Sequence, residues 1–165
     1  MTTIGTTMTT MTMTGTTKLP QLRHEDKHQI SPQEDLVLSG RLRRLFAHDA
    51  HAGLDGSYSV TSLYFDTPYD AALREKLDGV DRREKFRLRY YGEEPAWLKL
   101  EKKFKVNGLC GKGSARLSRE EGERVLGGDV GFLLQREEPV LRELYHKLRG
   151  NGLVPRAAVC YDREA

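Results

Sequence analysis

Charged and apolar residues alternate along two neighbouring segments in the middle of the chain, residues 83–91 and 97–106. Because side chains two positions apart point to the same face of a β-strand, each segment is predicted to be a strand with one cationic and one apolar face. The apolar positions are Phe86, Leu88, Tyr90, Leu98, Leu100, Phe104 and Val106. A turn at Gly92–Pro95 lies between the segments, so the pattern predicts a β-hairpin.

Weaker periodic signals predict four more strands and four helices. The strands are expected at residues 22–30, 58–66, 112–118 and 156–163, with a glycine-rich loop at 107–113. Ser-x-x-Glu capping boxes predict helices that begin after Ser31 and Ser118, and further helices are expected up to Leu77 and around 141–148. The apolar side of the first helix is expected to be Leu36, Leu38, Leu42, Leu45 and Phe46. We therefore expect one α+β domain over residues 21–165.

The first 17 residues have no such periodicity; they contain all four methionines, ten threonines and no charge. They lack the ~20 apolar residues of a membrane span and the basic and apolar regions of a signal peptide. We expect residues 1–20 to be a disordered leader outside the fold. The two cysteines, Cys110 and Cys160, have no disulfide-scaffold or metal-site spacing, which favours a reducing, cytoplasmic compartment.

The formal net charge of +3 conceals an asymmetric distribution. Residues 74–119 hold fourteen basic and seven acidic residues, a local net charge of +7, so the rest of the chain sums to −4. A basic block inside a nearly neutral protein indicates a polyanionic partner.

In the predicted hairpin, most of this charge lies on one sheet face. That face would carry seven cations and one carboxylate: Arg83, Lys85, Arg87, Arg89, Lys99, Lys103, Lys105 and Glu101. Like charges opposite one another destabilise a sheet, so we expect a bound anion to compensate them. The alternative is a solvated outer face.

The first predicted strand has a similar pattern, because Arg23, Glu25 and Lys27 share a face. These side chains form either local ion pairs or a site where the carboxylate holds Mg²⁺ or Mn²⁺ and the cations grip phosphate. The sequence leaves both open.

Several familiar motifs are absent. The segment ending at Gly113 fails as a P-loop, because Val106 occupies the first glycine position and Gly113 stands where Ser or Thr must bind Mg²⁺. There is no G-x-S-x-G or H-E-x-x-H motif, and the pair His48 and His51 lacks further zinc ligands. Acyl transfer and zinc hydrolysis are therefore not supported.

Six short motifs instead follow one another in a specific order: RHEDK (23–27), SLYFDT (62–67), EKLDG (75–79), KFRLRYYG (85–92), LEKK (100–103) and YDR (161–163). In this combination the chain, from about Arg23 to its last residue, resembles the VTC domain. This is the polyphosphate polymerase domain of the vacuolar transporter chaperone family, within the triphosphate tunnel metalloenzymes. The resemblance implies an antiparallel eight-stranded β-barrel that forms a basic tunnel and is braced by helices.

The resemblance also implies an activity and a site. VTC-type members bind ATP or triphosphate and polyphosphate with Mn²⁺ or Mg²⁺, and transfer the γ-phosphoryl group of ATP to a growing polyphosphate chain. The matching phosphate-binding positions are Lys27, Arg87, Arg89, Lys103, Lys112, Arg116 and Arg163, with Lys112 and Arg116 as alternatives for one position. Of these, Arg87, Arg89 and Lys103 would be catalytic, and Glu25 and Glu101 would be metal-side carboxylates.

The chain departs from the family at its end. The family continues past the Tyr-x-Arg strand into R-[IV]-T-[FL]-D and E-x-K strands, whereas this sequence ends at Ala165. We therefore expect an incomplete barrel with about six of eight strands, and the sequence leaves enzymatic activity open.

Other functions remain as alternatives: triphosphate hydrolysis, a non-catalytic polyphosphate or inositol-phosphate sensor, or a single-stranded nucleic-acid module using Tyr90, Tyr91 and Trp97. Nucleic acid is disfavoured, because Phe86, Leu88 and Tyr90 lie opposite the cations. The sequence contains no transmembrane segment, is compatible with a membrane partner and leaves the oligomeric state open.

Overall fold

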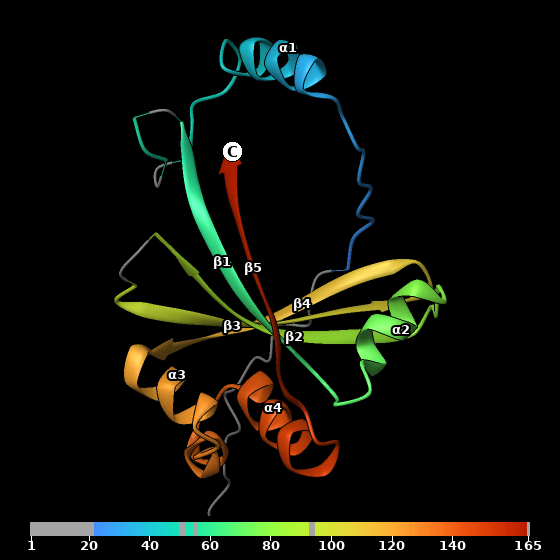
Figure 1. The fold of residues 1–165 in the computed structure, drawn as a ribbon, viewed down its shortest axis with the longest axis vertical. Helices are drawn as coiled ribbons and strands as arrows, with labels where there is room; N and C mark the ends of the chain where they lie inside the picture. Colours follow the sequence, from blue (N-terminus) through green and yellow to red (C-terminus); the bar gives the residue numbers. More distant parts are fainter. Residues whose placement is uncertain (1–21, 50–51, 55, 93–94, 165) are drawn as a thin grey trace, which may run out of the picture.

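Five strands form one antiparallel sheet in the computed structural model, which describes residues 22–49, 52–54, 56–92 and 95–164 (Figure 1). The strands are β1 (Ser57–Asp66), β2 (Arg83–Tyr91), β3 (Trp97–Val106), β4 (Leu109–Ser118) and β5 (Val154–Glu164). Their order across the sheet is β4-β3-β2-β1-β5, so β4 and β5 are the edges. The sheet in the described part of the chain is open. The structure therefore does not confirm the expected barrel or its truncation.

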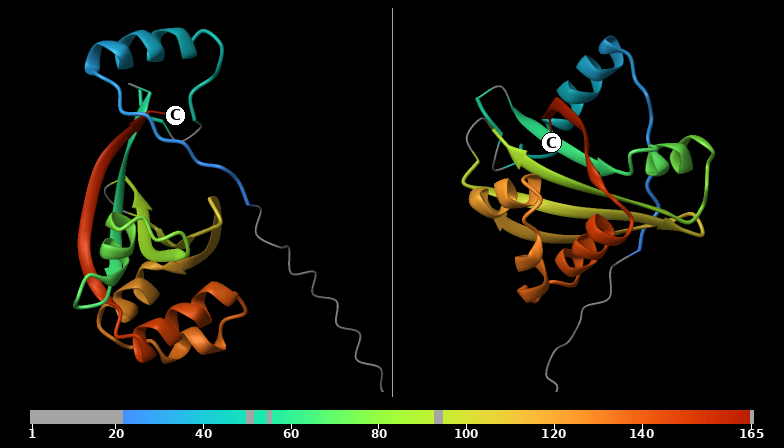
Figure 2. Two further views of the ribbon diagram at one scale, coloured as in Figure 1. Left: turned by 90° about the vertical axis from the view of Figure 1, so that its right-hand side faces the viewer. Right: turned by 60° about the horizontal axis from the view of Figure 1, so that its bottom comes forward.

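Helices lie on both sides of this sheet. They are α1 (Pro32–Leu42), α2 (Ala71–Leu77), α3 (Arg119–Leu126), the 3₁₀ helix η1 (Gly131–Gln135) and α4 (Pro139–Gly150). α3 and α4 cover one sheet face, whereas α1 stands away from the other (Figure 2). The core lies between the sheet and α3, η1 and α4: Phe65, Phe86, Leu88, Leu100, Ala115, Leu117, Val125, Val130, Leu133, Val140, Leu141 and Leu144.

The predicted hairpin is confirmed, with the bounds and the two faces expected from the alternation. Phe86 and Leu88 of β2 and Leu100 of β3 are buried against the helices. Both capping boxes are also confirmed: the side chains of Ser31 and Ser118 accept hydrogen bonds from the backbone N–H groups three residues later. The alternation predicted the two strands correctly because the side chains that it places on the apolar face are the ones that pack against the helices.

The glycine-rich loop expected at 107–113 is wrong. β3 turns into β4 through only Asn107 and Gly108, which have φ angles of 51° and 77°. Two residues with positive φ form the tight turn that fits the twist of a hairpin, and Asn-Gly is its preferred sequence. The Asp81 carboxylate accepts hydrogen bonds from the backbone N–H groups of both residues, at 2.7 and 2.9 Å. The remaining glycines therefore belong to β4.

Two of these glycines give a stability prediction with a built-in control. A Cβ at Gly111 would clash with the ring of Phe104, whereas at Gly113 it would meet only ordinary contacts with Val140 at 3.7 Å. We expect Gly111→Ala to destabilise the fold by about 1–3 kcal/mol, and Gly113→Ala to be neutral or slightly stabilising. Urea unfolding measures both. Equal stability of the two variants would contradict the close approach of the Phe104 ring.

The strand predicted at residues 22–30 is not formed. Only Arg23 pairs with the sheet, through reciprocal backbone hydrogen bonds with Cys110 of β4 at 3.0 and 2.8 Å. All residues from 22 to 30 are exposed. Apolar residues occur only at the two ends of the segment, so it has no apolar face to bury against the sheet.

The expected apolar side of α1 is likewise not buried. Leu36, Leu38 and Leu42, together with Leu45 and Phe46 after the helix, are all exposed. The side chains of Ser39 and Arg43 instead donate hydrogen bonds to Glu164 at the end of β5 (3.0 Å each). The segment 22–49 therefore links the two sheet edges, from Cys110 of β4 to Glu164 of β5, and passes over the face that α3 and α4 leave open.

Candidate anion-binding face

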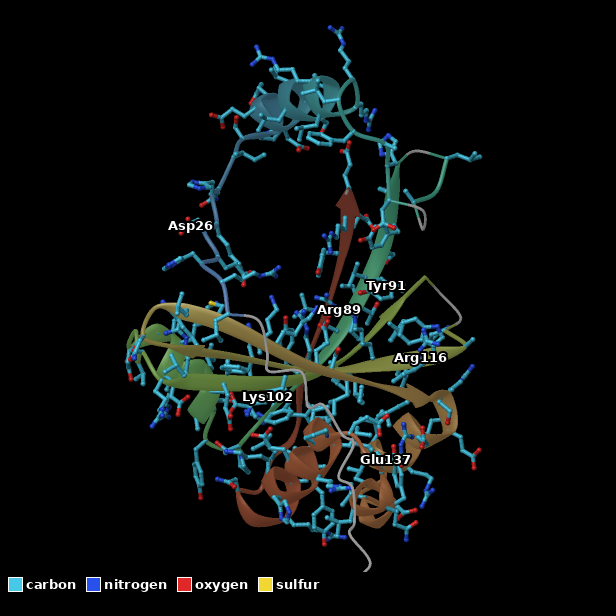
Figure 3. All side chains as sticks on the ribbon, turned by 180° about the vertical axis from the view of Figure 1, so that it is seen from behind. Asp26, Arg89, Tyr91, Lys102, Arg116 and Glu137 are labelled. Atoms are coloured by element: carbon cyan, nitrogen blue, oxygen red, sulfur yellow. The ribbon has the colours of Figure 1, made fainter. Side chains whose placement is uncertain are left out.

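The strand register gathers the cations on the sheet face opposite α3 and α4. Arg83, Lys85 and Arg89 of β2 lie directly across from Lys105, Lys103 and Lys99 of β3. The next strand adds Lys112 and Arg116, which pair with Lys103 and Lys99. Figure 3 shows Arg89 on this face and Lys102 on the opposite face. We call this surface the cationic face: Arg83, Lys85, Arg87, Arg89, Lys99, Lys103, Lys105, Lys112, Arg116 and Arg163.

Glu101 lies at the centre of the cationic face and is only 2% exposed. One of its carboxylate oxygens accepts hydrogen bonds from Nε and Nη2 of Arg87 at 2.8 and 2.6 Å. Arg89 and Lys99 approach the same carboxylate at 3.6 and 3.7 Å. Burial alone would raise the pKa of Glu101, but the hydrogen bonds and charge of Arg87, with the charges of Arg89 and Lys99, lower it below the ordinary value. Glu101 is therefore an ionised counter-charge for three cations.

Hydroxyl groups of β1 and β5 accept further hydrogen bonds from the guanidinium groups of Arg87 and Arg89. Nη1 of Arg87 donates to the hydroxyl of Tyr64 at 2.9 Å. Arg89 donates through Nε to Ser62 and through Nη2 to the hydroxyl of Tyr161, each at 3.1 Å. Both guanidinium groups are thus held in one orientation before any ligand binds.

Sequence reasoning assigned no role to these three hydroxyl residues. The available signal was the spacing of Ser62 and Tyr64, which are two residues apart on β1 and so share a face. Their pairing with Arg89 and Arg87 depends on the β1–β2 register, which periodicity does not define.

The more accessible cations surround this buried centre. The side chains of Lys99 and Lys103 keep 30% and 29% of their exposure, and Lys112, Arg116 and Arg163 are exposed. No ion pair among the described residues involves these last three. Burial lowers the pKa of Lys85, and the charges of Arg87, Lys27 and Lys103 add to the effect although Tyr64 opposes it. The face therefore has an excess of positive charge that an anion would relieve.

The segment before α1 brings one carboxylate to this face. Glu25 lies 3.5 Å from Nζ of Lys103 and 3.8 Å from Nζ of Lys27. The charge of Lys103 is the main cause of its lowered pKa, and Lys27 adds to it against the effect of burial. The sequence left either local ion pairs or a metal and phosphate site open for this segment, and the structure shows ion pairs. The side chain of Lys27 itself is 80% exposed.

The two predicted metal-side carboxylates do not form a metal centre. Glu101 and Glu25 are both ion-paired with cations of the face, and one oxygen of Glu101 accepts two hydrogen bonds from Arg87. Nowhere in the described ranges do three His, Cys, Asp or Glu side chains gather closely enough to hold a metal ion. Because protein cations already engage both carboxylates, these donors do not fit a Mn²⁺ or Mg²⁺ site built by the protein.

The lowered pKa of Glu101 predicts that stability falls in acid. A carboxyl whose folded-state pKa lies below its ordinary value of 4.5 contributes stability above that pH and loses it as the pH falls toward the folded value. We expect the free energy of unfolding to decline below about pH 4.5, and to decline less steeply in Glu101→Gln. Urea unfolding between pH 7 and pH 3 measures both slopes; equal slopes would contradict this role of Glu101.

The fold and site together define a class of protein: an α+β domain in which one face of an antiparallel sheet is rich in arginine and lysine. The family model described as VTC domain matches residues 22–165, and the chain belongs to that family. The family expected from the six motifs is thereby confirmed. The search of curated proteins gives no match. No helix in the described part of the chain is long and apolar enough to cross a membrane.

Proposed function

We propose that the cationic face binds the phosphate chain of ATP or triphosphate and of polyphosphate, and that the domain transfers the γ-phosphoryl group as a polyphosphate polymerase. The supporting observation is the pair Arg87 and Arg89, which Glu101 and three hydroxyls hold on a sheet face that also carries more accessible cations. Membership in the VTC domain family agrees with a polyphosphate-related function.

The chemistry that this proposal needs is mainly electrostatic. Phosphoryl transfer spreads negative charge over the phosphate oxygens, so preorganised cations stabilise the transition state without covalent chemistry by the protein. The planar guanidinium groups of Arg87 and Arg89 can each donate two parallel hydrogen bonds to phosphate oxygens. Lys103 supplies a compact positive charge that is more accessible to solvent. In this proposal these three side chains are catalytic. The outer phosphate contacts are Lys27, Arg163 and one of the two alternatives, Lys112 or Arg116.

Two measurements test the proposal. The first is the rise in melting temperature on adding inorganic tripolyphosphate, with sulfate at equal ionic strength as the control for general salt effects. We expect a large rise with tripolyphosphate and a small one with sulfate. Equal effects of the two anions would reject a phosphate-chain site.

The second measurement separates the possible activities. The protein is incubated with ATP and Mn²⁺, and the products are resolved on a polyphosphate gel. A ladder supports the polymerase, free phosphate alone indicates a triphosphate hydrolase, and tripolyphosphate binding without turnover indicates a sensor.

A further inference from the structure

Three aromatic side chains lie in a row across one end of the cationic face. Tyr58 of β1, Tyr91 of β2 and Trp97 of β3 come from adjacent strands. The ring centroids of Tyr58 and Tyr91 are 5.8 Å apart, and those of Tyr91 and Trp97 are 6.5 Å apart. We call these three residues the aromatic row. Each of them is only partly buried.

The aromatic row is on the same face as the cations, not in the hydrophobic core. Tyr91 follows Arg89 by two residues on β2, and Trp97 precedes Lys99 by two on β3, so each ring shares its strand face with a cation. Figure 3 shows Tyr91 and Arg89 on the same side of the sheet. The objection that stacking rings lie opposite the cations therefore applies to Tyr90 but not to Tyr91 or Trp97.

Two exposed arginines flank the row. The guanidinium carbon of Arg116 lies over the Trp97 ring, 4.1 Å from its centroid, and that of Arg163 lies 5.9 Å from the centroid of Tyr58. Nucleobases stack on aromatic rings and on arginine planes alike. The row and its arginines thus combine the two kinds of surface that hold a base.

From this arrangement we propose that the aromatic row with Arg116 binds the nucleobase of a nucleoside triphosphate whose phosphate chain lies on the cationic face. This inference rests on the phosphate-binding function proposed above. Two strand residues span about 6.6 Å, which is the scale of the one sugar that separates a base from its phosphates. A base on the row would thus direct the triphosphate toward Arg89 and the buried Glu101–Arg87 pair, and the row distinguishes a nucleotide from a bare phosphate chain.

The experiment compares ATP with inorganic tripolyphosphate on the full chain, with dissociation constants measured by calorimetry. Trp97→Leu removes the ring beneath Arg116, and Trp97→Phe keeps an aromatic ring as the matched control. We expect Trp97→Leu to weaken ATP binding by about tenfold or more and to change tripolyphosphate binding by less than about twofold. Trp97→Phe should retain most of the ATP affinity. Tyr91→Leu gives a second test of the row if Trp97→Leu does not fold.

Because Trp97 is the single tryptophan of the chain, its fluorescence reports on the row directly. We expect ATP to quench it strongly and tripolyphosphate to quench it much less.

The outcomes separate this inference from the function on which it rests. Equal weakening of both ligands by Trp97→Leu, or no weakening of either, overturns the base site while the phosphate-chain function stands. Absence of tripolyphosphate binding to the unmodified protein rejects the function itself. A single-stranded oligonucleotide without a terminal triphosphate is expected to bind more weakly than ATP; tighter binding would overturn the assignment to a nucleotide.

Discussion

Glu101→Gln should destabilise the free protein by about 3–5 kcal/mol and enlarge the stabilisation that tripolyphosphate gives. The carboxylate is almost fully buried and faces Arg87, Arg89 and Lys99. Removal of one partner from a buried ion pair leaves the other charges uncompensated, which is the costly case. A phosphate chain restores the missing negative charge, so binding and folding become more strongly linked.

Arg87→Ala should produce the opposite combination. It also breaks the buried pair, with a loss of similar size, but it removes a phosphate ligand and so reduces the stabilisation by tripolyphosphate. The two variants separate structural from binding roles, because they share the loss of stability and differ in the sign of the ligand effect. A loss of tripolyphosphate binding in Arg87→Ala alone could not make that distinction.

Melting temperatures with and without tripolyphosphate measure both effects, and Glu123→Gln is the matched control. Glu123 pairs with Arg119 at 3.1 Å on the surface of α3, with both side chains about two-thirds exposed, and such a pair contributes about 0–1 kcal/mol. If Glu101→Gln is as stable as Glu123→Gln, or if tripolyphosphate stabilises it less than the unmodified protein, Glu101 is not the counter-charge of this face.

Much of the cationic face could be predicted from the sequence because the alternation of residues within a single strand determines which side chains share a face. The alternation of Arg87 and Arg89 with Phe86 and Leu88 places charges on one side of β2 and apolar groups on the other, whatever the rest of the fold. The length and type of the turn determine the register of a hairpin, so the pairing of Arg89 with Lys99 could also be predicted.

The role of Glu101 could not be predicted in the same way. A lone carboxylate among cations has the same sequence signature as a metal ligand or as a buried counter-charge. Only the side-chain geometry separates the two, because it shows Arg87 donating two hydrogen bonds to one oxygen of Glu101. Ser62, Tyr64 and Tyr161 depend in turn on how β1 pairs with β2 and β5, and such contacts between distant segments leave no periodic signal.

Residues 22–49 show where local patterns fail. The capping box at Ser31 fixes the start of α1 correctly, but amphipathic spacing states only that Leu36 and Leu42 could be buried together. In the described structure both remain exposed, because the helix contacts β5 through Ser39 and Arg43 rather than through its leucines. Local chemistry determined the element, whereas its packing depended on the remainder of the chain.

The accessible cations should contribute to binding without the structural cost of Arg87. We expect the double variant Lys103→Ala/Lys112→Ala to weaken tripolyphosphate binding by at least about 100-fold, because each lost charged contact with phosphate is worth about 1.5–3 kcal/mol. The two residues face each other across β3 and β4, and neither is part of the buried Glu101 cluster. Stability should therefore change little, since the ion pair of Lys103 with Glu25 is partly exposed.

The matched control is Arg119→Ala/Arg149→Ala, which removes the same net charge from exposed positions on α3 and α4, on the other side of the sheet. Calorimetric titration at two salt concentrations measures both double variants, and salt should weaken the residual binding of the Lys103/Lys112 variant less than that of the control, because fewer ionic contacts remain to be screened. If both double variants lose affinity equally, tripolyphosphate responds to the net charge of the chain and not to this face. A loss confined to Lys103→Ala/Lys112→Ala places the phosphate chain over β3 and β4, directly beside the buried Arg87–Glu101 pair.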